Sequence, residues 1–310
     1  MVSCNNCGLD APLRCAGCKG APSYHNGEGL NVSYCSRECQ KADWPHHKTA
    51  CRKLKERKSL LRAVALLKAT MISHREVQYN WNLTKIEPRD EALFLKLNRK
   101  RYGLPRPVKF PDHLTSNAEH KEAALLKRMG LKTICVLGTM TRTLLEGLVS
   151  DLKVVKVRIA NPPYPAILDP ADANAFHNFM DPGEHMIVLV TLWSSHEKWV
   201  VDITGCQFGF KGALFPFEKY ISEKHCTIIG TLGPYTQTET WDQEHIMSLM
   251  GNTLPPEARA VMVKEMEDRR HFAALVKKHV NSSLIEGSDA EFEAKVVEFS
   301  QKVKTHMSSC

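Results

Sequence analysis

Four pairs of metal-binding side chains lie within the first 51 residues, and they constrain the fold of this chain more than any other feature. The pairs are Cys4 with Cys7, Cys15 with Cys18, Cys35 with Cys39, and His47 with Cys51. Only two or three residues separate the members of a pair, so both can reach one ion from a tight turn or from successive helical turns. Eight such ligands are enough for two tetrahedral zinc sites.

The spacing alone leaves open which pairs share an ion. In the consecutive arrangement, the first two pairs bind one ion and the last two pairs bind the other. The interleaved arrangement joins Cys4, Cys7, Cys35 and Cys39 at one ion and Cys15, Cys18, His47 and Cys51 at the other. Soft thiolates with one imidazole favour zinc over hard cations. Because four protein ligands leave no open coordination position, we expect both ions to be structural.

The run from Tyr34 to Cys51, YCSRECQKADWPHHKTAC, resembles the MYND zinc finger. Every fixed position of that family's run, YCS-x2-CQ-x2-DW-x2-HK-x2-C, is matched, and the resemblance extends over residues 4–51. It implies the interleaved (cross-brace) pairing. It also implies that His47, and not the neighbouring His46, is the zinc ligand.

The same resemblance implies a function in protein interaction. MYND fingers are protein-interaction modules, and several bind short proline-rich peptides through the Gln and Trp of the CQ-x2-DW run. These residues are Gln40 and Trp44 in this chain. A flat indole face suits an extended proline segment, and a carboxamide can hydrogen-bond to its backbone. The competing interpretation is that Trp44 only packs the small helix against the next one.

Cysteine distribution, apolar runs and net charge indicate where the protein resides and which partners it could bind. Seven of the eleven cysteines lie in the first 51 residues, and the N-terminus does not resemble a secretory signal, so we expect an intracellular protein, cytoplasmic or nuclear. No apolar run is long enough to predict a membrane span. The net charge of +8 makes nucleic acid an alternative partner. We favour a solvated helix face as the explanation of that charge.

Hydrophobic periodicity beyond the finger predicts an α+β chain with four regions. We expect a MYND-type finger at 1–53, a helical linker region at 54–118, an α/β body at 119–240 and a helical C-terminal region at 255–306. Leu60, Val64, Leu67 and Met71 form an apolar stripe on a long helix. Two apolar runs, 185–193 and 199–204, predict a central antiparallel hairpin in the body.

Three residues of the body indicate an alternative function. Cys135, His185 and Asp202 follow the order in which transglutaminase-like and papain-type enzymes place a nucleophile at a helix start, a base at a strand start, and an acid in a W-x2-D-x-T run. Trp199, Asp202 and Thr204 fit that run. This weaker resemblance implies a cysteine-dependent hydrolase or transferase. The leading hypothesis remains a zinc-dependent adaptor or regulator.

Overall fold

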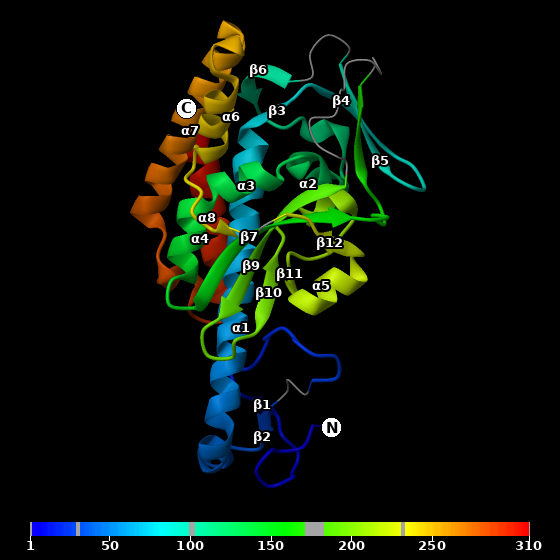
Figure 1. The fold of residues 1–310 in the computed structure, drawn as a ribbon. Coiled ribbons are helices and arrows are strands. Elements are labelled where there is room, and N and C mark those ends of the chain that lie inside the picture. The colour runs from blue at the N-terminus through cyan, green and yellow to red at the C-terminus, as the bar shows by residue number, and fades with distance from the viewer. Residues whose placement is uncertain (1, 29–31, 99–102, 171–182, 231–232, 310) are drawn as a thin grey trace.

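One long helix organises the computed structural model, which describes residues 2–28, 32–98, 103–170, 183–230 and 233–309. Helix α1 (Arg37–Val77) begins after Ser36, whose hydroxyl accepts a hydrogen bond from the backbone N–H of Cys39. It runs from the N-terminal segment into the centre of the molecule (Figure 1). The predicted stripe from Leu60 to Met71 is buried, which confirms its helical spacing.

The N-terminal segment lies beside the first turns of α1 (Figure 1). Strands β1 (Leu13–Arg14) and β2 (Ser33–Tyr34) pair antiparallel, and β2 leads directly into the helix. The hydroxyl of the buried Tyr34 donates a hydrogen bond to Asp43 of α1 over 2.7 Å. This contact fixes the small hairpin against the helix.

The main sheet is antiparallel and has the strand order β11-β10-β9-β7-β12, with β13 also paired to β7. Its strands are β7 (Val149–Ile159), β9 (Glu184–Leu192), β10 (Lys198–Val201), β11 (Leu214–Pro216), β12 (Cys226–Ile228) and β13 (Gly233–Pro234). Strands β9 and β10 form the predicted hairpin, with Thr191 opposite Lys198.

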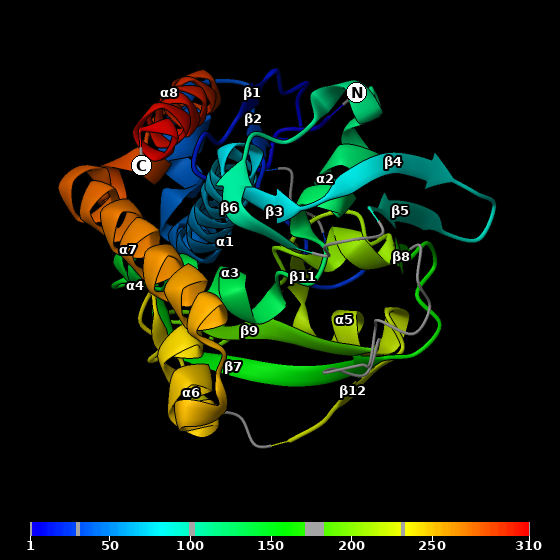
Figure 2. The same cartoon turned by 90° about the horizontal axis from the view of Figure 1, so that it is seen from above.

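Side chains alternate between the two faces of this sheet. Val188 and Val190 of β9 face the large core around α1, whereas Ile187 faces a smaller core against α5 (Phe217–Glu223). Both faces are therefore covered. Helix α3 (Gly130–Val136) lies between α1 and β9 (Figure 2).

The region expected to be a helical linker is only partly helical. Beyond Val77 it forms β3 (Tyr79–Trp81), β4 (Leu83–Pro88), β5 (Leu93–Leu97) and β6 (Gly103–Val108). Strand β3 pairs with β6, and β5 lies between β4 and the parallel strand β8 (Ala166–Pro170). The period-two burial of Leu93, Leu95 and Leu97 is typical of a strand.

The remaining helices surround α1 and the sheet. They are α2 (Ala118–Leu126), α4 (Gly138–Leu145), α6 (Trp241–Met250), α7 (Pro256–His279) and α8 (Asp289–Ser308). The C-terminal pair, α7 and α8, packs beside α1 (Figure 1). None of the helices among the described residues has the length and apolarity that crossing a bilayer requires.

Candidate functional site

The first metal-binding group consists of Cys4, Cys7, Cys35 and Cys39. The Sγ atom of Cys7 lies 3.5 Å from that of Cys35 and 3.7 Å from that of Cys39, and the last two are 3.4 Å apart. In a regular tetrahedron with Zn–S bonds of about 2.3 Å, neighbouring sulfurs would be about 3.8 Å apart. The four thiols therefore fit one zinc ion.

The second group consists of Cys15, Cys18, His47 and Cys51, all buried. The Sγ atoms of Cys15 and Cys51 are 3.7 Å apart, and Nε2 of His47 lies 3.2 Å from Sγ of Cys18. Burial lowers the pKa of His47, which favours the neutral imidazole that binds zinc. The adjacent His46 is exposed, so the choice of His47 as ligand is supported.

Glycine at position 17 makes the second group compact. A Cβ atom built on Gly17 would lie 2.9 Å from Sγ of Cys51, closer than real side chains approach. The turn between Cys15 and Cys18 can therefore pass against the sulfur of a ligand from α1 only because residue 17 has no side chain. This close approach joins the N-terminal turn to the helix.

The family model for the MYND finger matches residues 4–51, the stretch that contains both groups. These residues form a MYND finger. The two ligand groups fit its two structural zinc ions in the interleaved arrangement, as the resemblance implied. No curated protein and no solved structure matches the chain.

The residues predicted to bind peptide lie on one face of the finger's helix. Gln40 and Trp44 are four residues apart on α1, and four-residue spacing places side chains on the same face. Trp44 is 46% exposed, and its ring meets that of His47 at 6.1 Å in an edge-to-face arrangement. One side of the indole thus contacts a zinc ligand, and part of it remains open to solvent.

The structure brings together two of the three candidate catalytic residues. Nε2 of His185 lies 2.8 Å from Oδ1 of Asp202, and the hydroxyl of Tyr220 donates to Oδ2 of Asp202 over 2.9 Å. The ring of Phe208 covers His185 at 4.9 Å. All four side chains are buried.

Cys135, the third candidate, lies on α3 and is not part of this hydrogen-bonded group. Its helix begins at Gly130, so Cys135 is five residues on and about 140° around the axis from the helix start. Burial and the nearby carboxylate of Asp242 raise the pKa of Cys135 to about 12. At neutral pH this thiol remains protonated, which makes it a poor nucleophile.

Sequence reasoning missed a junction between the finger and the body. The guanidinium of Arg57 on α1 binds Glu28 of the finger at 2.7 Å and Glu197 of the β9–β10 turn at 2.6 Å. The ring of Tyr24 packs 5.2 Å from that of Trp199. We call these five residues the finger–hairpin junction. Because Arg57 and Glu197 are 140 residues apart, local spacing gives no signal for it.

Proposed function

We propose that the finger binds an extended, proline-rich segment of a partner protein through Gln40 and Trp44. The observation that carries this proposal is the half-exposed indole of Trp44 beside a zinc ligand. MYND fingers are commonly involved in protein–protein interaction, and this finger contains the Gln and Trp of the family run. The chain would therefore act as an adaptor or regulator.

The chemistry of the two side chains supports such a ligand. An indole face offers flat apolar area to proline rings, which are already held in an extended conformation and lose little entropy on binding. The carboxamide of Gln40 can donate and accept a hydrogen bond, as a peptide backbone requires. Both residues lie on a helix that carries zinc ligands, so the surface is rigid before the partner arrives.

The test measures binding of fluorescein-labelled proline-rich peptides to the full chain by fluorescence anisotropy. We expect Trp44→Ala to raise Kd by at least about thirtyfold, the effect of losing an aromatic hot spot worth about 2 kcal/mol. Gln40→Ala should raise Kd by about fivefold, because one hydrogen bond contributes about 1 kcal/mol. Zinc content should be unchanged in both variants.

Trp193 provides a matched control, because it is 62% exposed and follows β9 in the body. Trp193→Ala should bind the peptides as the unaltered chain does. An unchanged Kd for Trp44→Ala, or an equal loss in both tryptophan variants, would contradict the proposed surface.

A further inference from the structure

A buried chain of hydrogen-bonded groups in the body includes neither the zinc ligands nor Gln40 and Trp44. Tyr220 donates to Asp202, and Asp202 lies within hydrogen-bond distance of Nε2 of His185. In a neutral histidine, a carboxylate that accepts from the N–H of one ring nitrogen leaves the other nitrogen unprotonated and able to take a proton. This is the arrangement of an orienting acid and a general base.

The second ring nitrogen of His185 faces Gly130. A Cβ atom built on Gly130 would lie 3.5 Å from Nδ1 of His185 and 3.6 Å from Cβ and N of Met186, all of which are ordinary van der Waals distances. Gly130 is not among the residues with positive φ, so its backbone does not require glycine. Position 130 can therefore accept a side chain, and that side chain would meet the base.

We propose that residue 130 is the nucleophile position of a thiol-type acyl-transfer site, and that this chain carries glycine there. His185 and Asp202 keep the geometry of the base and its orienting acid, and Gly130 supplies no atom that could form a covalent intermediate. The body would thus retain two parts of a three-part catalytic site. This assignment concerns the body and is independent of the peptide surface on the finger.

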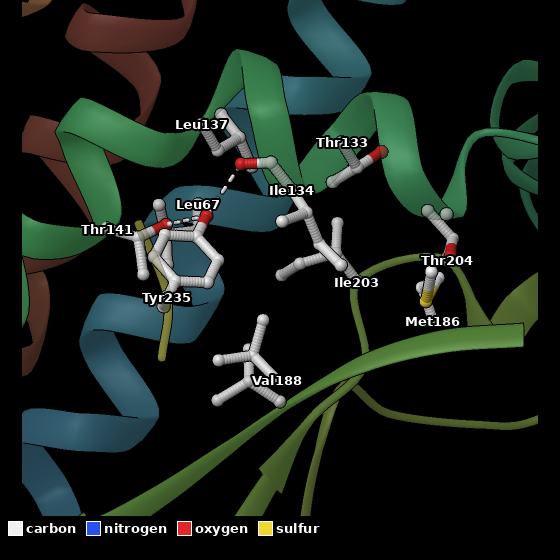
Figure 3. Close-up of a pocket in the computed structure, with 12 residues that line it drawn as sticks. Leu67, Thr133, Ile134, Leu137, Thr141, Met186, Val188, Ile203, Thr204 and Tyr235 are labelled. Carbon is white, nitrogen blue, oxygen red and sulfur yellow. Dashed lines mark hydrogen bonds between the residues drawn. The ribbon is translucent and has the colours of Figure 1, made fainter. Parts of the chain in front are cut away.

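A small cavity adjoins the proposed position. Its volume is about 20 Å³, room for about one water molecule, and Gly130 is among the residues that line it. Thr133, Met186 and Thr204 lie at one end and Tyr235 at the other (Figure 3). The buried hydroxyl of Thr133 has no hydrogen-bond partner among the described residues. An atom introduced at position 130 would therefore border both His185 and a cavity.

Introducing the missing thiol tests the assignment. In Gly130→Cys, the Sγ proton should move to Nδ1 of His185, which leaves a thiolate beside an imidazolium that Asp202 stabilises. An ordinary thiol with a pKa of about 8.5 is only about 0.3% ionised at pH 6. The thiolate absorbance at 240 nm, measured at pH 6 against the unaltered chain, reports ionisation without needing access for a reagent.

We expect Gly130→Cys to show most of one thiolate equivalent at pH 6. The matched control is Thr133→Cys, which places a thiol on the same helix beside the same cavity and should show almost none. Adding His185→Gln to Gly130→Cys should abolish the signal. A signal no larger than that of Thr133→Cys, or one that survives His185→Gln, would overturn the proposal.

Whether the Gly130 variants fold also tests the proposal. Gly130→Ala adds only the Cβ atom, and circular dichroism and thermal unfolding should show a folded chain, because that atom has room. If Gly130→Ala or Gly130→Cys does not fold, position 130 does not accommodate a side chain, and the assignment is overturned. A folded Gly130→Ala would show that position 130 has room for a Cβ atom.

Discussion

Individual side chains decide how the finger folds, because eight of them supply the ligands of both metal groups. Half of the buried apolar cluster of the finger is cysteine, and the other members are Ala11, Ala21, Tyr34 and Leu54. Metal binding must therefore supply most of the folding free energy, about 10–16 kcal/mol per site in finger peptides.

The interleaved pairing can be tested with two double variants. Cys7→Ser with Cys39→Ser removes two ligands from one interleaved site, so native mass spectrometry should find one zinc ion per chain. Cys7→Ser with Cys18→Ser removes one ligand from each site, so we expect less zinc in that variant. Consecutive pairing predicts the reverse order of zinc content, and that result would contradict the structure.

Ionised Glu265 on α7 should stabilise the folded state, and this stabilisation should be lost at acidic pH. Burial raises its pKa, but the charges of Lys132 and Arg269 outweigh burial and lower it from 4.5 to about 2. A lowered carboxylate pKa stabilises the folded state above pH 4.5, and this contribution is lost as the pH falls from 4.5 to 2. Removing one partner of a buried ion pair lowers the free energy of unfolding by about 3–5 kcal/mol.

We therefore expect Glu265→Gln to lower the free energy of unfolding by about 3 kcal/mol at pH 7 in urea titrations. The difference from the unaltered chain should shrink as the pH falls towards 2. Glu267→Gln, on the same helix but exposed, is the control and should change stability little. A deficit for Glu265→Gln that is constant with pH would show that ionisation of Glu265 is not its cause.

At the residue scale, the sequence predicted contacts between partners that are close along the chain. The zinc ligands form local pairs with a recognisable spacing, and they lie together in the structure as the resemblance implied. The sequence did not predict contacts between distant partners: Glu265 meets Lys132 only because α7 packs against α3. Such pairs depend on tertiary packing, which local patterns do not encode.

At the scale of elements, α1 links the finger to the body. It carries the zinc ligands Cys39, His47 and Cys51, and Arg57 of the finger–hairpin junction lies less than two turns beyond the last of them. The helix continues without interruption across the boundary expected at residue 53. The position of the hairpin is therefore tied to the finger by α1 and by the finger–hairpin junction.

Arg57→Ala should weaken the junction without removing zinc. It leaves the carboxylates of Glu28 and Glu197 without their buried cation, so hydrogen exchange in the β9–β10 hairpin should become faster. Arg52→Ala changes an exposed arginine on the same helix and is the control. Equal exchange rates in the Arg57 variant and the unaltered chain would show that the junction does not stabilise the hairpin.

Long periodic elements were predicted well, and short ones were not. The helical stripe of α1, the helical C-terminal region and the β9–β10 hairpin match the structure. Strands β3 to β6 were missed because they are short and their pairing is partly non-local. In particular, β5 pairs with β8, although β6, α2, α3, α4 and β7 lie between them along the chain.

At the scale of the whole molecule, the finger lies at one end of α1, and the sheet and C-terminal helices surround the other end (Figure 1). The α+β class and the two-zinc finger agree with the sequence prediction. The four region boundaries remain predictions, although α8 packs along α1 and so joins the C-terminal region to the helix that leaves the finger.

The central claim is that two closed zinc sites hold the finger together. The most direct test is hydrogen exchange on the full chain with and without a strong zinc chelator. We predict that amides within residues 4–51 lose protection on chelation, whereas those in the middle of α7 and α8 keep it. Unchanged protection in residues 4–51 after the zinc has been removed would contradict the claim.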